Sequence, residues 1–253
     1  WDFVREVVKF DGNRWKGEDW LKQRGERVTW RDHFVCSRDL CVIGKTVVLP
    51  AGGRTVFLDD AGTEARLRAA GEMPSYHGRE YPATFGQSAD AAGNVYVQWH
   101  RRDNAGRLDR VRLADDGVST ELVPGTETYI SLPDLLSFAP VSVRDGAIYR
   151  VRPQEGMGLC RHTMEQEEPE VLCAAASICP AIITQKHVVY GGLDGRLHVV
   201  PLAGGAAASY PTAFGCPISA PLAMADGRVY VACEDGYLYV FGADGHAELP
   251  TKS

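Results

Sequence analysis

The chain has 253 residues, a formal net charge of -6 at pH 7, and 45% hydrophobic residues. The acidic balance and the scattered Lys and Arg side chains argue against a nucleic-acid partner. No apolar run reaches the ~20 residues that a membrane-spanning helix needs, so we expect a protein that does not span a membrane. The length suits one large all-β domain with a sizeable core.

Residues 1–35 form an irregular entry segment in this interpretation. Val4–Phe10 and Arg27–Phe34 have the composition of strands, and Glu18–Arg24 has that of a short helix. The segment is either an elaborated entry into the fold or part of a further, incomplete repeat unit.

Residues 36–253 contain five blade-like repeats of one strand–turn–strand unit. Equivalent positions at the start of the second strand fall at residues 46, 95, 148, 188 and 229, which gives spacings of 49, 53, 40 and 41. Repeats of about 40–45 residues made of short strands are typical of propeller blades, and insertions in loops explain the longer spacings.

The turns between the strands support the same interpretation. Asp194-Gly195 and Asp235-Gly236 lie 41 residues apart, each between two runs of β-branched and aromatic residues. Asp-Gly in this setting favours a type I′ hairpin turn, in which both central residues have positive φ. A further internal repeat relates residues 81–86 (YPATFG) to residues 210–215 (YPTAFG), at an offset of three periods of 43.

We therefore predict an all-β fold, a β-propeller of four-stranded antiparallel blades in a single domain over residues 1–253. Five repeat units are clear. The alternatives are six units, with the entry segment as the sixth, or a segment of a larger seven- or eight-bladed ring.

The last unit, residues 221–241, reads Pro-x-x-x-x-x-Gly-x-Val-Tyr-Val-x-x-x-Asp-Gly-x-Leu-Tyr-x-Phe, and residues 180–200 match it nearly as well. This pattern resembles the pyrroloquinoline-quinone-like repeat of the quinoprotein alcohol dehydrogenase-like propellers. The resemblance implies a propeller. Members of that superfamily include quinone-dependent dehydrogenases, outer-membrane assembly scaffolds and sensor domains attached to kinases.

The chain lacks three features of the quinone-dependent dehydrogenases: the adjacent cysteines against the quinone, the haem-attachment motif and the tryptophan-docking motif that ends their blades. No two cysteines are adjacent, there is no Cys-x-x-Cys-His, and all five tryptophans lie at or before Trp99, so the clearest repeats have no docking tryptophan. We therefore expect neither a quinone nor another cofactor, and no bound metal. The paired acids Asp59-Asp60 and Asp115-Asp116 suit turns better than acid–base catalysis.

Binding sites on a rigid β scaffold usually lie on its loops. The long early spacings enlarge the loops around Tyr76 and His77, around Trp99, His100 and Arg101, and around Tyr129. Aromatic and Arg side chains often anchor binding surfaces, and we expect Trp99 to be exposed at a hairpin tip. The predicted ligand- or partner-binding residues are Tyr76, His77, Trp99, His100, Arg101 and Tyr129. The alternative is a set of solvated loops whose aromatic rings fold back onto the blades.

The sequence favours a non-catalytic binding, scaffold or sensor propeller that recognises a protein or small-molecule ligand through loops on one face. The alternative is a propeller enzyme: a glycoside hydrolase, a lyase or a fragment of a quinone-dependent dehydrogenase. A glycosidase would need two carboxylates in an axial pocket. The sequence does not determine the oligomeric state.

The seven cysteines are compatible with disulfides. The pairs we consider are Cys36–Cys41, Cys160–Cys173 across a hairpin, and Cys179–Cys216 between neighbouring units. Such bonds would fit a periplasmic or secreted protein. The alternative is that all seven serve as small buried apolar residues.

Overall fold

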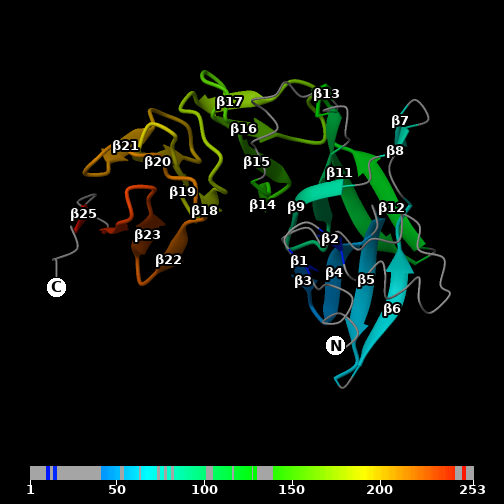
Figure 1. Cartoon of the computed structure of the whole chain (residues 1–253). Coiled ribbons are helices and arrows are strands. Elements are labelled where there is room, and N and C mark those ends of the chain that lie inside the picture. The colour runs from blue at the N-terminus through cyan, green and yellow to red at the C-terminus, as the bar shows by residue number, and fades with distance from the viewer. Residues whose placement is uncertain are drawn as a thin grey trace.

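The computed structural model describes residues 10–11, 14–15, 41–51, 54–62, 64–72, 75–76, 79–80, 83–100, 105–115, 117–126, 128–129, 139–242 and 247–248. Every regular element within these ranges is a β-strand. Five antiparallel sheets follow one another along the chain and stand side by side around an open arc (Figure 1). The predicted all-β, blade-like architecture is therefore confirmed. The predicted strands and helix of the entry segment lie almost entirely outside the described residues.

Each sheet is a blade whose strands are paired in chain order. The first blade consists of β3 (Cys41–Ile43), β4 (Thr46–Ala51), β5 (Arg54–Asp60) and β6 (Ala65–Ala70). The second consists of β9 (Ala83–Ala89), β10 (Val95–His100), β11 (Ala105–Ala114) and β12 (Gly117–Leu122), with β13 (Thr128–Tyr129) paired to the start of β11.

The last three blades follow the same order. The third has β14 (Ser142–Arg144), β15 (Ala147–Val151), β16 (Leu159–His162) and β17 (Glu170–Cys173). The fourth has β18 (Ile182–Ile183), β19 (His187–Gly191), β20 (Arg196–Pro201) and β21 (Ala208–Pro211). The fifth has β22 (Ala223–Ala225), β23 (Arg228–Ala232), β24 (Leu238–Phe241) and β25 (Ala247–Glu248). Two small hairpins, β1 (Phe10–Asp11) with β2 (Arg14–Trp15) and β7 (Ser75–Tyr76) with β8 (Arg79–Glu80), lie outside the blades.

The core lies between blades rather than inside any one of them. Successive side chains of a strand point to opposite faces, so each blade presents one apolar row to the blade before it and another to the blade after it. One cluster joins Tyr149 and Leu159 of the third blade to Val188 and Tyr190 of the fourth. The next joins Leu197 of the fourth blade to residues of the fifth, and equivalent clusters join the first blade to the second and the second to the third.

From the second blade onward, side chains on or just before the innermost strand join each blade to the next. Ser88 donates a hydrogen bond to the carbonyl of Val141, and Ser142 donates to the carbonyl of Ala181 at 2.5 Å. The Cys179 thiol donates to the carbonyl of Ala220 at 3.1 Å. These bonds supply polar contacts at the crowded inner edge of the arc, where small side chains bring the backbones close together.

The turn type at the two repeated Asp-Gly pairs differs from the prediction. Only Gly195 and Gly236 have positive φ there (71° and 85°), while Asp194 and Asp235 do not. These hairpins are longer than two residues, because Gly191 pairs with Leu197 across five intervening residues. The type I′ pattern occurs instead in two-residue hairpins of the third and fifth blades, where Asp145 and Asp226 have φ values of 51° and 50°.

The two turn glycines differ in the space around them, which predicts unequal costs of substitution. A Cβ at Gly195 would lie 2.3 Å from the carbonyl carbon of Gly215, whereas a Cβ at Gly236 would meet nothing within 4 Å. Gly236→Val is expected to cost about 1–3 kcal/mol through positive φ alone. Gly195→Val is expected to cost more, because the backbone of the neighbouring loop must also move. Urea unfolding of both variants measures the difference, and equal midpoints would contradict it.

Candidate functional site

Loops from neighbouring blades meet at one end of the sheets. The loop between β17 and β18 donates the Ser177 N–H to the Arg152 carbonyl at 2.7 Å, in the β15–β16 loop. On its other side, its Ala176 carbonyl accepts from the Leu193 N–H at 2.9 Å, in the β19–β20 loop. We call this end the loop face. In the third and fourth blades, the loop between the blades therefore contacts the loops that join the second and third strands.

The predicted binding residues are only partly placed by the structure. His77 and Arg101 lie outside the described residues. The backbone of His100, at the end of β10, pairs with Gly106, and that of Tyr129 pairs with the adjacent Ala105, so these two residues lie at the same edge of the second blade. Tyr76 belongs to the separate β7–β8 hairpin. A binding role for this set stays a prediction.

The expectation that Trp99 is exposed is wrong. Its side chain is 1% exposed and packs in the core between the first two blades with Val97 and Phe57. The reason is that β10 extends to His100, so Trp99 continues the inward row of Val95 and Val97. Its ring supports the blade interface and does not offer a contact surface.

Trp99→Ala should therefore act on stability. Truncating a buried aromatic side chain typically costs about 3–5 kcal/mol, because the cavity is refilled incompletely. Chemical denaturation of the variant would measure this loss. A cost within about 0.5 kcal/mol, the usual range of surface substitutions, would show that the ring is not part of the core.

The disulfide predictions that the structure can test are wrong. Cys160 and Cys173 carry free thiols, because Cys160 lies opposite Val171 and Cys173 opposite Leu159, on different faces of the third blade. Cys179 and Cys216 are also free thiols, and Cys179 uses its hydrogen to join neighbouring blades. Cys36 lies outside the described residues, so the Cys36–Cys41 pair stays a prediction.

One position in the third strand of the blades carries side chains of very different chemistry. It lies opposite Val97, Arg150, Tyr190 and Val231 of the second strands, and it is occupied by Asp109, Cys160, His198 and Tyr239 in the second to fifth blades. All four third-strand residues are buried. Because each faces the preceding blade, this position places polar groups at the blade interfaces.

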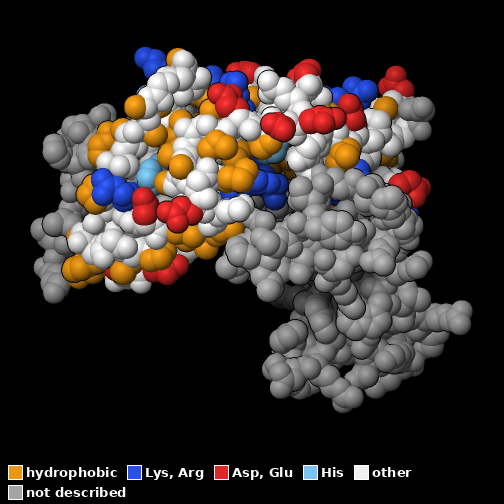
Figure 2. Space-filling view, turned by 90° about the horizontal axis from the view of Figure 1, so that it is seen from above, with side chains coloured by type: hydrophobic (Ala, Val, Ile, Leu, Met, Phe, Trp, Pro, Cys, Tyr) orange, Lys and Arg blue, Asp and Glu red, His pale blue; other side chains and the backbone are white. Residues whose placement is uncertain are grey.

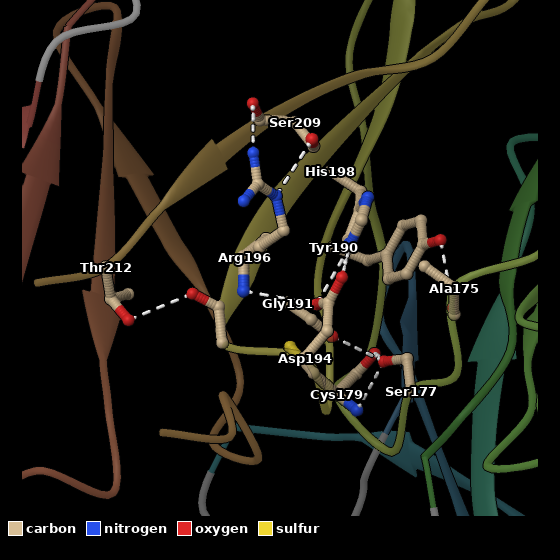
Figure 3. A network of polar contacts seen from close by, with 11 residues as sticks. Ala175, Ser177, Cys179, Tyr190, Gly191, Asp194, Arg196, His198, Ser209 and Thr212 are labelled. Carbon is tan, nitrogen blue, oxygen red and sulfur yellow. Dashed lines mark hydrogen bonds and ion pairs between the residues drawn. The ribbon is translucent and has the colours of Figure 1, made fainter. Parts of the chain in front are cut away.

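In the fourth and fifth blades this position completes a latch across the Asp-Gly turn. Asp235 accepts from the Tyr237 N–H at 2.9 Å and from the Tyr239 hydroxyl at 2.6 Å. Asp194 repeats the arrangement, accepting from the Arg196 N–H at 3.2 Å while both its oxygens lie 3.1 Å from Nε2 of His198 (Figure 3). The turn and the third strand are thereby fixed to each other.

The latch of the fourth blade extends into a polar network. The ring of His198 stacks on Tyr190 at 5.0 Å between centroids, and the Tyr190 hydroxyl donates to the Ala175 carbonyl at 3.1 Å. The half-buried Cys173 of the third blade packs against the apolar cluster that contains Tyr190. The imidazole of His198 is thus held between the Asp194 carboxylate and the Tyr190 ring.

The protonation equilibria of this network are coupled. The hydrogen bond with His198 lowers the pKa of the Cys173 thiol to about 7, although burial acts in the opposite direction. Burial lowers the pKa of His198, but its hydrogen bonds with Cys173 and Asp194 outweigh burial and leave that pKa raised.

Sequence reasoning missed this network and one aromatic pair. The sequence analysis assigned Asp194 to a turn only, although the i,i+4 spacing in Asp-Gly-x-Leu-His repeats as Asp-Gly-x-Leu-Tyr. Phe214 is 64% exposed in the loop between β21 and β22 and stacks on Tyr237 at 5.4 Å. The internal repeat between residues 81–86 and 210–215 was the signal that this loop recurs in the chain.

His162 in the third blade is a second buried histidine, with different surroundings. It is 1% exposed, and neither ring nitrogen has a hydrogen-bond partner among the described residues. Burial, followed by the charges of Arg150 and Arg152, lowers the pKa of His162 to about 4. The folded protein therefore holds this imidazole neutral.

This histidine predicts a loss of stability in mild acid. The unfolded chain protonates His162 near its ordinary pKa of about 6.5, so the unfolded state binds more protons between about pH 6.5 and pH 4. The contribution of His162 is complete above pH 6.5 and falls by up to about 3 kcal/mol as the pH drops to 4. His162→Phe should flatten this part of the stability profile, with His187→Phe as the control. Identical profiles for His162→Phe and the unaltered protein would contradict the assignment.

Three further observations do not identify a binding site. No described helix is long and apolar enough to cross a membrane. Within the described ranges, no group of three or more His, Cys, Asp or Glu side chains could hold a metal ion. On the side displayed in Figure 2, basic and acidic side chains are interspersed among hydrophobic ones.

Comparisons with known proteins support the fold. No protein-family model matches the chain, and no curated protein matches it. Among solved structures, the chain is similar to PorZ, described as an essential bacterial surface component of the type-IX secretion system of Porphyromonas gingivalis, with 14% identity and a TM-score of 0.58. That match covers 85% of this chain and only 28% of the PorZ chain. At this identity it indicates a shared fold and nothing more.

Two computationally designed proteins are also similar. Ika8 has 12% identity and a TM-score of 0.47, over 87% of this chain and 78% of its own. Ika4 has 14% identity and a TM-score of 0.45, over 68% of this chain and 97% of its own. Both scores are too low to indicate a relationship.

Proposed function

We propose that this chain is a non-catalytic binding, scaffold or sensor propeller, with repeats of the pyrroloquinoline-quinone-like type, that holds a protein partner. The proposal rests on one leucine position that the second to fifth blades share. In these four blades the leucine directly precedes the latch position and lies on the face of the sheet turned away from the preceding blade.

The exposure of this leucine changes abruptly at the last blade. Leu108, Leu159 and Leu197 are 2%, 0% and 1% exposed, each in the cluster shared with the next blade. Leu238 occupies the same position in the fifth blade and is 54% exposed. The same leucine position is thus buried in three blades and exposed to solvent in the fifth.

Leu238 belongs to a wider apolar surface. Ala232 pairs with Leu238 and Tyr230 pairs with Val240, so these four side chains lie on one face of the fifth blade, together with Ala223. We call these five residues the end face. Ala223, Ala232 and Leu238 are exposed, and the charged Arg228 and Glu234 lie beside them. An exposed apolar patch with a polar rim is typical of a protein-binding surface.

The other parts of the proposal come from the sequence and the loop face. The loops around Tyr76, His77, His100, Arg101 and Tyr129, with Trp99 as internal support, are the proposed second contact surface, for a protein or a small-molecule ligand. The exposed Phe214 ring adds an aromatic contact on the loop between β21 and β22. A periplasmic or secreted location is part of the proposal, without support from disulfides in the described residues.

The end face can be tested by comparing two exposed apolar residues. Leu238→Lys introduces a charge at the end face, and Val171→Lys introduces the same charge on the exposed edge strand β17 of the third blade. Proteins retained by the immobilised unaltered chain are identified, purified and titrated against all three chains by calorimetry. We expect Leu238→Lys to raise the dissociation constant about tenfold or more, the scale of a binding hot spot.

Val171→Lys is the control, because it places the same charge on an exposed apolar residue outside the end face. Val171→Lys should leave the dissociation constant unchanged, and both variants should keep the unfolding temperature of the unaltered protein. A partner that binds Leu238→Lys as tightly as the unaltered chain does not use the end face, and the proposal for that face then fails.

A further inference from the structure

The first blade carries an apolar face that no described blade covers. Val42, Val47, Leu58 and Leu67 are paired in register across β3, β4, β5 and β6, so one apolar row crosses the whole sheet. The pair formed by Leu49 and Val56 adds a second row on the same side. We call this surface the start face, and its residues are Val42, Val47, Leu49, Val56, Leu58 and Leu67.

The start face is accessible, whereas the other face of the same sheet is buried. Val42 is 65% exposed and Leu67 is 67% exposed, and the other four side chains are half-buried. None of the six belongs to an apolar cluster that joins described blades. On the opposite face, Val48 and Phe57 are 0% and 1% exposed in the cluster shared with the second blade. The first blade therefore has one buried and one accessible apolar face.

Later blades bury the face that corresponds to the start face. Val47 lies one pair beyond the pair that closes the β3–β4 turn, which is the place of Ile148 in the third blade and of Val188 in the fourth. Ile148 and Val188 are both 0% exposed, each in the cluster shared with the preceding blade. The start face is therefore the side of a blade that normally receives the blade before it.

The start face and the end face are the two halves of one repeated interface. Leu108 shares a cluster with Ile148 at one internal joint, and Leu159 shares one with Val188 at the next. By position, these pairs correspond to Leu238 of the end face and Val47 of the start face. The surface that the leucine position packs against inside the array is thus present once more, uncovered, on the first blade.

We propose that the end face of one copy of this chain stacks on the start face of a second copy, head to tail. The inference rests on the proposed function, because it names the protein partner of the end face. The first and fifth blades stand at opposite ends of the open arc, so their uncovered faces meet only between copies (Figure 1). Terminal units of a repeat array usually have polar outer faces, and here both outer faces are apolar.

Charges at the edges of the two faces are compatible with this stacking. Arg54 is exposed at the start of β5, next to the hairpin between the second and third strands of the first blade. Glu234 is exposed in the loop between the second and third strands of the fifth blade. A joint built like the internal ones brings these two hairpins to the same edge, so an arginine meets a glutamate there. Such complementarity favours the correct register of association.

Self-association of the full chain is measured by sedimentation velocity from about 1 µM to about 200 µM, a range that covers micromolar dissociation constants. We expect the mass to rise with concentration. Leu238→Lys and Leu67→Lys should each raise the dissociation constant about tenfold or more, and Val171→Lys should leave it unchanged. Both leucines are more than half exposed, so these variants should keep the unfolding temperature. A chain that stays monomeric over the whole range would overturn the proposal.

A mixing experiment tests the head-to-tail geometry itself. Leu238→Lys keeps an intact start face, and Leu67→Lys keeps an intact end face. An equimolar mixture should form a complex of one copy of each, at least about tenfold tighter than either variant forms alone. If Leu67→Lys associates like the unaltered chain while Leu238→Lys does not, two end faces pair with each other and the proposed geometry is wrong.

The outcomes separate this inference from the proposed function. A monomeric chain whose captured partner binds Leu238→Lys more weakly keeps the end face as a binding surface and rejects only the second copy as its occupant. If Leu238→Lys alters neither self-association nor the binding of any captured partner, both proposals fail. Rescue in the mixture of Leu238→Lys with Leu67→Lys supports both, because it requires one end face and one start face.

Discussion

Each blade of this chain is a single four-stranded sheet, and a single sheet cannot bury the apolar side chains on its own two faces. The apolar rows of each sheet are covered only when another sheet lies against them, so stability depends on face-to-face stacking in sequence order. The leucine before the latch position illustrates the constraint. This leucine is buried against the next blade in the second, third and fourth blades. In the fifth blade it is exposed, because no described sheet follows.

Stacking of this kind also decides where polar chemistry can sit. A buried polar side chain needs a partner, and at a blade interface the partner can come from the adjacent sheet or from a turn of the same sheet. Tyr239 and His198 find theirs in the turn aspartate, whereas His162 finds none among the described residues. The latch position therefore holds a tyrosine or a histidine fixed by a turn aspartate, whereas His162 lies two residues beyond that position in the third blade and has no such aspartate.

The fold could be predicted because it is repetitive: the spacing of glycine turns and the alternation of residues in the second and third strands are both local signals. The turn type at Asp194 was not predictable from the dipeptide, since hairpin length rather than composition selects it. Trp99 was predicted to be exposed although Val95, Val97 and Trp99 alternate, because the hairpin tip was expected to begin before the end of β10. The hydrogen bond between Tyr190 and the Ala175 carbonyl could not be predicted, since it forms only when two blades stack.

The fastening of the inner strands has a consequence for how such an array can change over time. In each of these bonds a small side chain of one blade, on Ser88, Ser142 or Cys179, donates to a main-chain carbonyl of the next. Every residue type has a main-chain carbonyl, so the sequence of the accepting blade can vary freely without loss of this hydrogen bond. A duplicated or exchanged blade needs only its own small donor to fit between new neighbours. This tolerance offers a physical reason why units that share so few residues can stack in the same way.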